Sequence, residues 1–457
     1  MDVPGGSPVS ATIIERNVIK LADVRGLTGS MSIKYTISNG AGSAVGEISI
    51  IRIPAPDKWL APRVEPDTAI VRVGDVVSIP VLANDTDPNG EVLKSPVVVE
   101  AGNAESGKLF TDQNQLRFIA GQTAGKVQGV YKVANSSGQF GSAQVSITVV
   151  AADAEHNLPP APKNLTGRVI AGDQVKIPVT LNGIDPDGDS VELVGVDKAP
   201  SLGTAETGNG YIYYTAGGNS AGTDTFSYRV RDRLGAEAIA RVDVGVAPPL
   251  TLNHPPVTED DFITMRPGRK VSLDVMLNDS DPDGGLLGLV KNGFKGPEEM
   301  LPTVTDKGKV LVTSPQEPGT ATMMYTVADK FGAKATGNIR MTVTPEAPLK
   351  APIARDDRVT VKQMLGKNTV DVPVLENDAD PDGVTEELKV AVEAAPGASA
   401  PDASVTSTGA VRVVLTAGAQ MIPYTITDQD GLKATAVIWV PGLISSTPCS
   451  RATTSSA

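Results

Sequence analysis

Apolar and polar residues alternate strictly in four short runs of this chain, and each run ends just before an asparagine. Apolar side chains stand three, five and seven residues before Asn84, Asn182, Asn278 and Asn377. Successive side chains of a β-strand point to opposite faces, so this period of two predicts four half-buried strands. Three runs carry a proline at a matching outward position: Pro80, Pro178 and Pro373. Because proline cannot donate to a ladder, we expect this strand to lie at a sheet edge or to break there.

A second alternating run surrounds a tyrosine that recurs along the whole chain. The tyrosines are Tyr35, Tyr131, Tyr228, Tyr325 and Tyr424, separated by 96, 97, 97 and 99 residues. A turn of the form Asp/Asn-x-x-Gly follows each of them and leads into a third alternating run, such as residues 145–149. Two alternating runs joined by such a turn predict a β-hairpin. Sustained helical periodicity is absent from the sequence of these units.

The period of nearly 100 residues makes each unit a whole domain, because a domain of that size can close its own core. With about seven strand signals per unit, we predict an all-β tandem array of immunoglobulin/cadherin-like Greek-key β-sandwich domains. The tyrosine is then either the corner tyrosine of such sandwiches or a large strand residue with a polar tip. The predicted boundaries are 1–53 (the second half of a repeat), 57–150 (repeat 1), 157–247 (repeat 2), 254–344 (repeat 3), 352–441 (repeat 4) and 442–457 (a disordered tail).

The segments between repeats are rich in proline, which favours extended, semi-rigid linkers. We therefore expect the repeats to stand in file, with four of them spanning on the order of 150 Å. The chain opens on half a repeat and ends in a Ser/Thr-rich tail. We interpret it as a fragment of a longer protein, so the lack of a signal peptide at its start says little about location.

Composition narrows the classes of partner. The formal net charge is −13 and the sequence pI is near 4.8, which argues against nucleic acid and makes multivalent cations the natural counterpart. The single cysteine, Cys449, lies in the tail, so the repeats have no disulfides. No apolar stretch approaches the roughly 20 residues of a membrane span. Stiffness must come from packing or from metal.

The acidic loop after the first strand is the strongest chemical candidate. It reads Asn-Asp-x-Asp-Pro-Asp/Asn-Gly in three repeats, with oxygen-bearing side chains at alternate positions. That spacing can turn three oxygens toward a hard cation such as Ca²⁺, which takes six to eight oxygen ligands. The candidate ligands are Asp85, Asp87 and Asn89 in repeat 1, Asp279, Asp281 and Asp283 in repeat 3, and Asp378, Asp380 and Asp382 in repeat 4.

Two further observations qualify this site. The loop is not an EF-hand, because the position that requires a bidentate glutamate holds Pro96, Val290 or Lys389. The remaining ligands have a source upstream: Asp67 and Asp261 stand seventeen residues before the loop asparagine, and Asp357 stands about twenty before it. The alternative is that these residues form only tight, solvated turns, since Asn, Asp, Pro and Gly are also what such turns prefer.

These motifs together resemble the bacterial cadherin-like, immunoglobulin-like tandem repeats of large surface and secreted proteins. The resemblance covers about residues 57–441 and rests on Asn-Asp-x-Asp-Pro-Asp-Gly, on Tyr-x-Val-x-Asp and on an Asp-Asp pair near the start of a unit. It implies a β-sandwich stalk or adhesin segment with calcium at loops near domain junctions. Repeat 2 departs from the pattern, with Gly183 at the first acidic position and Leu165 in place of the upstream acid.

Signals of catalysis are weak. The string from Gly218 to Gly222 matches a hydrolase nucleophile elbow around Ser220, but it lies in a turn, and the only histidines, His156 and His254, lie in linkers. We therefore expect a non-enzymatic extracellular or cell-surface segment. Its expected partner is a cell-surface or matrix ligand, and we expect the segment to be monomeric within a longer polypeptide. The alternatives are an array that binds carbohydrate or protein, and an accessory region of a larger secreted enzyme. Exposed aromatics do not recur at one position per repeat, which favours the stalk.

Overall fold

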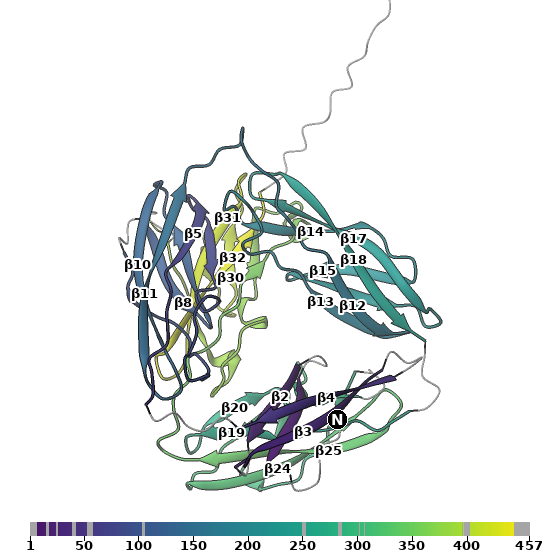
Figure 1. Cartoon of the computed structure of the whole chain (residues 1–457). Helices are drawn as coiled ribbons and strands as arrows, with labels where there is room; N and C mark the ends of the chain where they lie inside the picture. Colours follow the sequence, from purple (N-terminus) through teal and green to yellow (C-terminus); the bar gives the residue numbers. More distant parts are fainter. Residues whose placement is uncertain are drawn as a thin grey trace, which may run out of the picture.

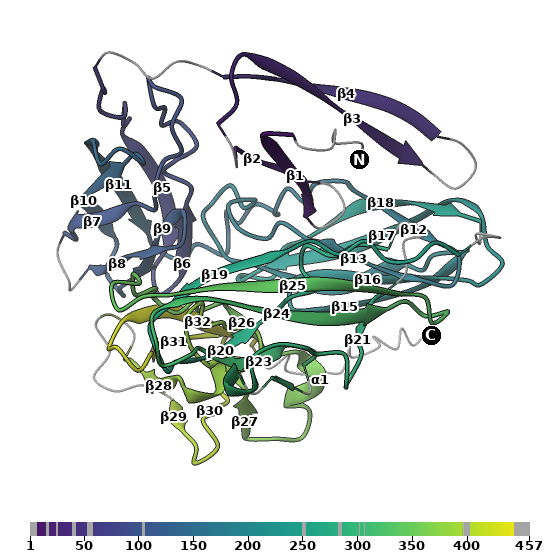
Figure 2. The ribbon, with the colours of Figure 1, turned by 90° about the horizontal axis from the view of Figure 1, so that it is seen from below.

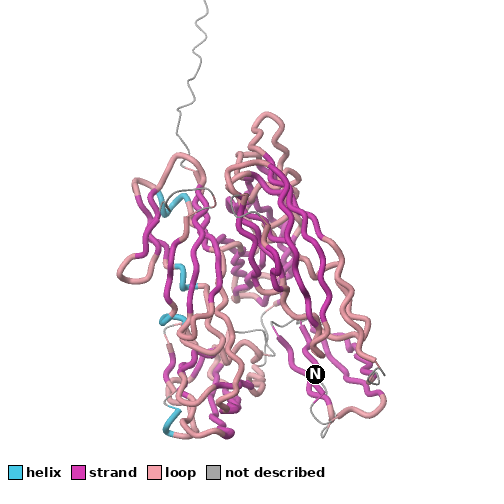
Figure 3. The backbone as a smooth tube through the Cα atoms, turned by 90° about the vertical axis from the view of Figure 1, so that its left-hand side faces the viewer, coloured by secondary structure: helices cyan, strands magenta, loops and turns pink. Residues whose placement is uncertain are grey.

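The computed structural model describes residues 7–442, apart from 15–17, 24–25, 39–42, 53–57, 103–105, 249–252, 282–285, 301, 306, 395 and 397–402. Cys449 and the predicted tail lie outside the described residues. Strands dominate this part of the chain, and helix is confined to a few short turns (Figure 3). In the part that is described, no helix has the length and apolar character needed to cross a bilayer.

Seven strands recur in each of the four repeats and form two sheets. In repeat 1 the four-stranded sheet has the order β5-β11-β10-β7 and the three-stranded sheet the order β6-β9-β8. The first strand, β5, runs parallel to the last, β11, while the other pairs are antiparallel. The strands of repeat 1 are β5 (Asp67–Arg72), β6 (Val76–Ile79), β7 (Val97–Glu100), β8 (Gly107–Asp112), β9 (Gln115–Ala120), β10 (Gly125–Ala134) and β11 (Phe140–Val150). This Greek-key sandwich confirms the predicted fold class.

The same topology returns in the other three repeats. Repeat 2 has β12 (Leu165–Ile170), β13 (Gln174–Pro178), β14 (Val191–Lys198), β15 (Gly203–Gly208), β16 (Tyr211–Ala216), β17 (Gly222–Asp232) and β18 (Glu237–Ala247). Repeat 3 has β19 (Asp261–Met265), β20 (Lys270–Leu273), β21 (Gly288–Leu289), η1 (Glu298–Met300), β22 (Thr303–Val304), β23 (Val310–Thr313), β24 (Gly319–Ala328) and β25 (Lys334–Val343). Repeat 4 has β26 (Asp357–Arg358), α1 (Val361–Met364), β27 (Thr369–Val372), η2 (Val374–Glu376), η3 (Thr385–Glu387), β28 (Lys389–Val392), β29 (Ala403–Val405), β30 (Val411–Val414), β31 (Gln420–Thr427) and β32 (Lys433–Val440).

The N-terminal segment forms two hairpins, β1 (Val9–Ile14) with β2 (Val18–Asp23) and β3 (Ser30–Ser38) with β4 (Ser43–Ile51). Its small core includes Val9, Leu27 and Ile33. The β3–β4 hairpin carries Tyr35 on the strand that the repeat pattern predicts. The hairpin turn itself, residues 39–42, lies outside the described residues.

The proline strand behaves as its sequence predicts. It lies at the edge of the three-stranded sheet in every repeat, as β6, β13, β20 and β27. In repeats 1 and 4 the strand ends immediately before Pro80 and Pro373, and in repeat 2 it ends on Pro178. Proline has no N–H to donate to a ladder, and an edge strand tolerates this because it pairs with a neighbouring strand on one side only.

Each recurring tyrosine of repeats 1 to 4 has its ring in the core and its hydroxyl against the backbone of the segment that leads into its repeat. The hydroxyl oxygens of the four tyrosines lie 2.6–3.3 Å from backbone carbonyl oxygens: Tyr131 from Glu65, Tyr228 from Lys163, Tyr325 from Glu259 and Tyr424 from Arg355. The side chains are at most 1 % exposed. This is the corner-tyrosine arrangement that the sequence left open.

The residue across the hairpin from each tyrosine is always small. The partners of Tyr35, Tyr131, Tyr228, Tyr325 and Tyr424 are Gly46, Ala143, Ala240, Gly337 and Ala436. At Gly337 a Cβ atom would lie 2.4 Å from the ring of Tyr325, so the ring covers the glycine backbone. A tyrosine ring can pack against its own hairpin only if the residue opposite it is small enough to leave room for the ring.

We therefore expect Gly337→Val to destabilise repeat 3 by about 1–3 kcal/mol, because the added side chain must displace a buried tyrosine. Urea unfolding of the full chain measures the effect. Gly245→Ala is the control, since the nearest atom to its Cβ would lie at 3.9 Å. Equal stability of the two variants would contradict the packing described here.

Neighbouring repeats touch at an equivalent place in every junction. The turn after the first strand of one repeat pairs with the β-hairpin turn of the next, through Arg233 at 3.9 Å from Asp75, Lys330 at 2.6 Å from Asp173 and Arg269 at 2.5 Å from Asp430. At the last junction the charges are exchanged, because the earlier repeat supplies the basic residue and the later repeat the acid. Proline-rich linkers therefore do not hold the repeats apart.

The chain also folds back, so that repeat 1 lies beside repeat 4 (Figures 1 and 2). The expectation of four repeats in file is thus wrong for this structure. Proline content restricts the path of a linker but does not decide which surfaces of the repeats meet, and contacts between repeats set the arrangement.

Candidate metal sites in the acidic loops

Backbone pairing fixes the acidic loop against the segment that leads into its repeat. Thr86 exchanges two hydrogen bonds of 2.8 and 3.0 Å with Arg63, and the equivalent pairs are Ser280 with Val257 and Ala379 with Ile353. This bridge lies directly after the first acidic position. As a result, the first acid of the loop turns inward under the corner tyrosine, while the later acids turn toward the hairpin and the linker.

The first acid and the upstream strand acid meet at the tyrosine hydroxyl in repeats 3 and 4. We call these three groups the tyrosine cluster: Tyr325 with Asp261 and Asp279 in repeat 3, and Tyr424 with Asp357 and Asp378 in repeat 4. The hydroxyl of Tyr325 lies 3.1 Å from both carboxylate oxygens of Asp279, and that of Tyr424 lies 3.3 and 3.4 Å from those of Asp378. Asp261 also lies against the hydroxyl of Tyr325, and Asp357 against that of Tyr424, so each upstream acid lies beside the first loop acid of its repeat.

The tyrosine cluster holds more oxygen atoms than hydrogen-bond donors. A tyrosine hydroxyl donates one proton, yet that of Tyr325 also faces the carbonyls of Glu259 and Val275, at 3.3 and 3.1 Å. One backbone N–H, from Glu259, donates to Asp279, and the N–H of Arg355 donates to Asp378. One carboxylate oxygen, Oδ2, of Asp261 and of Asp357 is buried without a partner.

The leading asparagines add to this shortage. The amide oxygens of Asn278 and Asn377 are also buried without a partner, so the same two atoms are orphaned at equivalent positions of repeats 3 and 4. Buried polar atoms are normally satisfied, and a recurrent exception points to a missing proton or ion. The donor set consists of oxygen atoms alone, which is the set that Ca²⁺ prefers.

The protonation behaviour of these acids follows from their burial. Burial raises the pKa of Asp357 to about 8 and that of Asp378 to about 7. In repeat 3, burial raises the pKa of Asp261 to about 7 and that of Asp279 to about 6. The carboxylate of the neighbouring loop acid adds to the rise for both strand acids. Near neutral pH each cluster therefore takes up either a proton or a cation.

Repeat 1 has a smaller version of the cluster. The hydroxyl of Tyr131 donates to Asp67 over 2.6 Å, and Asp85 accepts from the N–H of Glu65 over 2.9 Å. The second carboxylate oxygen of Asp85 is buried without a partner, and burial raises the pKa of this acid. The tyrosine thus serves one acid and leaves the other with one oxygen unpaired.

Repeat 2 shows what the fold does without these acids. Gly183 and Leu165 stand in their places, and the hydroxyl of Tyr228 donates to the carbonyl of Lys163 over 2.6 Å. The corner tyrosine and its backbone bond are therefore independent of the carboxylates. The acids of repeats 1, 3 and 4 are an addition to a fold that closes without them.

The later acids of the loop form a second group, the turn cluster, with the hairpin turn. In repeat 1 Asp87 accepts from the N–H groups of Asn89 and Glu91 and from the side chain of Asn135, over 2.8, 3.0 and 3.0 Å. Asn89 holds the linker by two bonds to the backbone of Leu60. These two predicted ligands thus close a turn and dock a linker, and they do not converge with Asp85 on one point.

The turn cluster of repeat 4 is more acidic. Asp382 accepts from the N–H of Lys350 in the linker over 3.1 Å. Burial raises the pKa of Asp380 to about 6, and the carboxylates of Asp382 and Asp428 add to the rise. One oxygen of Asp428, in the hairpin turn, is buried without a partner. Asp281 of repeat 3 is buried at the corresponding place, and Asp283 lies outside the described residues.

Among the described residues, carboxylate oxygens of three acids lie within 4.8 Å of one another in the loop of repeat 2, from Asp185, Asp187 and Asp189. Sequence reasoning gave this loop the least weight. The guanidinium of Arg72, from repeat 1, lies 2.9 Å from Asp189 and 3.5 Å from Asp187. An arginine of the preceding repeat thus supplies the positive charge here and joins the two repeats.

Sequence reasoning missed several members of both clusters. The sequence pattern indicates only a strand or turn role for these members: the hydroxyls of Tyr325 and Tyr424, the amides of Asn278 and Asn377, and the turn residue Asp428. Their constant distance from the acids in each repeat was a usable signal, because residues at fixed spacing in equivalent domains occupy equivalent places.

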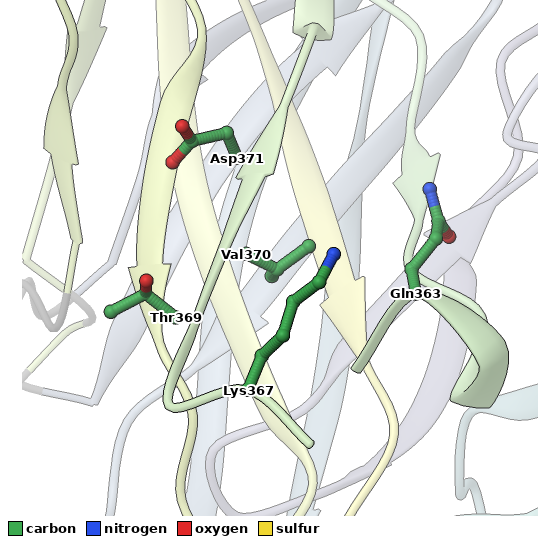
Figure 4. Close-up of a pocket in the computed structure, with 5 residues that line it drawn as sticks. All are labelled: Gln363, Lys367, Thr369, Val370 and Asp371. Atoms are coloured by element: carbon green, nitrogen blue, oxygen red, sulfur yellow. The ribbon is translucent and has the colours of Figure 1, made fainter. Parts of the chain in front are cut away.

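One surface hollow of the described residues lies elsewhere, beside α1. It has a volume of about 300 Å³ and is lined by Gln363, Lys367, Thr369, Val370 and Asp371 (Figure 4). Asp371 pairs with Arg412 at 2.7 Å on the open surface of the same repeat. Ser220 of the elbow-like string donates its hydroxyl to the carbonyl of Gly217 over 2.7 Å, as a turn residue does. Neither place has the geometry of a nucleophile with its base.

Comparison with known proteins agrees with this architecture. The model of the family described as "Bacterial Ig domain" matches four segments: 60–148, 157–245, 253–342 and 350–440. No curated protein matches the chain.

The solved structures that match the chain include cadherin ectodomains and an insect immune protein. The human Desmocollin-1 ectodomain matches with 14 % identity over 85 % of this chain and 81 % of that one, at a TM-score of 0.18. Drosophila N-cadherin EC1-4 matches with 12 % identity over 83 % and 99 %, at 0.20. The insect immune protein hemolin matches with 15 % identity over 84 % and 100 %, at 0.23. Values this low carry no argument about ligand or arrangement. The family match alone covers most of the residues, and the chain therefore belongs to the bacterial Ig domain family, as a tandem array of four repeats.

Proposed function

We propose that this chain is a non-enzymatic, extracellular adhesion or stalk segment that binds calcium at the tyrosine clusters of repeats 3 and 4. The observation that carries the calcium site is a shared shortage of hydrogen-bond donors. In each cluster two carboxylates meet at one tyrosine hydroxyl. Equivalent oxygens of the strand acid and of the leading asparagine are buried without a partner in both clusters. The net charge of −13 and the tandem Ig-like domains support an extracellular role.

In each cluster the ligands would be the strand acid, the first loop acid and the leading asparagine. The cation would neutralise the paired carboxylates and tie the loop, the first strand and the incoming segment together. The turn cluster of repeat 4, with Asp380, Asp382 and Asp428, is a second candidate of the same chemistry. Because the turn cluster contacts the linker, a cation there would stiffen the junction between repeats 3 and 4.

Calorimetric titration of the full chain with calcium chloride tests the proposal. We expect saturable binding with a dissociation constant on the order of 10⁻⁴ to 10⁻³ M, the range of extracellular modules. The double variant Asp261→Asn, Asp357→Asn should lose the sites of the tyrosine clusters, and Asp380→Asn should affect only the turn cluster. Asp243→Asn, at a half-buried surface acid of repeat 2 that pairs with Arg241, is the matched control.

The outcomes separate cleanly. Binding that survives the double variant but is lost in Asp380→Asn would move the site to the turn cluster. Absence of heat and of any change in melting temperature up to roughly 10 mM calcium, well above that affinity range, would mean that the acid pairs hold protons and would overturn the proposal.

A further inference from the structure

Both faces of the last two strands of repeat 4 are buried. In β31 and β32 the inward residues pack in the core, but Thr425, Val437 and Trp439 on the outward face are also at most 6 % exposed. The equivalent strands of repeats 1, 2 and 3 alternate between buried positions and positions that are half-buried or exposed. Something must therefore cover the outward face of this one sheet.

The outward residues of repeat 4 differ from those of the other repeats in chemistry as well. Registered on the residue opposite the corner tyrosine, Val437 stands where the others have Gln144, Arg241 and Asn338. Trp439 stands where they have Ser146, Asp243 and Arg340. A sandwich that faced water here would keep polar residues at these positions, and its three neighbours do.

The surface that covers this face belongs to repeat 1. Arg117, on the outward face of β9, is 3 % exposed and donates two parallel bonds of 2.7 Å to the carboxylate of Asp356, next to β26. Lys108 of β8 pairs with Glu393 at 2.5 Å. Glu393 in turn accepts from Thr425 over 2.6 Å, which connects the pair to the outward face of β31.

Arginine is costly to bury unless its partner and geometry are well matched. A bidentate pair with a carboxylate is the arrangement that meets this condition, and Asp356 is itself held by the N–H of Val437 over 3.0 Å. The equivalent arginine in repeat 4, Arg412, stays on the surface with 52 % of its side chain exposed. Arg117 is therefore specialised for a partner outside its own repeat.

A second arginine extends the contact to repeat 2. Arg358 of β26 lies over the ring of Trp439, with 5.7 Å between the guanidinium carbon and the ring centre. Its Nη1 donates to the carbonyl of Val191 at the start of β14, over 3.2 Å. Three repeats thus meet around this residue, and the packing joins segments that are more than 160 residues apart in the sequence.

We infer that the outward face of β31 and β32 is a built docking surface whose occupant is repeat 1 of the same chain, so that the array closes on itself through Arg117, Trp439 and their partners. The closed form is then the ground state of the region. A chain of this length would have a radius of gyration near 23 Å if fully compact, against roughly 40 Å or more for four repeats in file.

Small-angle scattering of the full chain, with light scattering for the mass, tests closure. We expect a monomer with a radius of gyration clearly below the in-file value, and Arg117→Glu should raise it by roughly 10 Å because the new carboxylate faces Asp356 and Asp112. Arg412→Glu is the matched control and should change nothing. Circular dichroism confirms that both variants keep their strands.

A charge exchange guards against nonspecific effects. Lys108→Glu should open the array partly, and Lys108→Glu combined with Glu393→Lys should restore the compact form, since both side chains are half exposed and the repeats fold without them. An extended wild-type monomer would overturn the inference. So would a compact dimer that loses its compactness on dilution, because the occupant would then be repeat 1 of a second copy.

Discussion

In the presence of a chelator, the melting temperature of the chain is expected to fall as the pH is raised from 5 to 9. Burial places the pKa values of Asp261, Asp279, Asp357 and Asp378 between about 6 and 8 in the folded chain. The value of an aspartate in an unfolded chain is about 3.9. Between about pH 4 and 8 the folded chain binds more protons than the unfolded chain, so each rise in pH favours unfolding.

This change of stability with pH is opposite in sign to that produced by an aspartate in a salt bridge, whose stabilising effect grows as the pH rises. The four acids together should lower the melting temperature by more than about 5 °C across this window. Differential scanning calorimetry at fixed ionic strength measures it. Excess calcium should flatten the curve, because a cation replaces the protons that the higher pH removes.

The double variant Asp261→Asn, Asp357→Asn is the control for this experiment. It removes the two acids with the most strongly raised pKa values in their clusters and should show a weaker dependence on pH in chelator than the wild type, because Asp279 and Asp378 remain buried. A wild-type melting temperature that rises from pH 5 to 8 in chelator would contradict the burial and pairing described for these carboxylates.

Replacing the corner tyrosine of repeat 4 should have the largest effect of any single substitution. Tyr424 is fully buried in the core of its repeat, and its hydroxyl anchors the segment that leads into the repeat at Arg355. Loss of a buried aromatic ring costs about 3–5 kcal/mol. We therefore expect Tyr424→Ala to leave repeat 4 largely unfolded at room temperature while the other repeats persist.

Tryptophan fluorescence can follow this loss selectively. Trp439 lies in repeat 4 at 5 % exposure, while Trp59 lies near the first linker and is 41 % exposed, so a Trp59→Phe background isolates the reporter. Tyr424→Phe should cost only about 1–2 kcal/mol but should alter calcium binding, since the hydroxyl serves Asp378. Tyr228→Phe should cost about as much as Tyr424→Phe and leave calcium binding unchanged. Equal unfolding of Tyr424→Ala and wild type would refute the assigned role.

The fold was predictable because two simple periodicities dominate it. Alternation before the loop asparagines and around the tyrosines gave β6, β10 and their equivalents, and the Asp-x-x-Gly turns gave the hairpins. The small residue opposite each tyrosine, such as Gly337, was visible in the sequence at a nearly constant distance but was not used. Side-chain size at one position becomes meaningful only once the hairpin register is known.

The candidate site was predictable in its residues but not in its grouping. Alternate acids suggested one cation held by three oxygens, whereas Asp378 joins Tyr424, and Asp380 joins Asp428. Spacing along a loop does not determine its backbone angles, and a bridge such as that of Ala379 with Ile353 decides which way each acid turns. The arrangement of the repeats was harder still to predict, because it depends on outward positions such as Trp439. The sequence marks such a position only by an apolar residue where the other repeats have polar ones.

The parallel pairing of first and last strands determines how each repeat would respond to tension. A pull on the two ends of a repeat loads this pair lengthwise, so its hydrogen bonds must break together and not one after another. The pair spans six residue partners in repeats 1 and 2, five in repeat 3, and only two in repeat 4, Asp357 with Ile438 and Arg358 with Trp439. Repeat 4 is thus expected to unfold at a lower force than the other three repeats. A cation on Asp357 would reinforce the element that yields first.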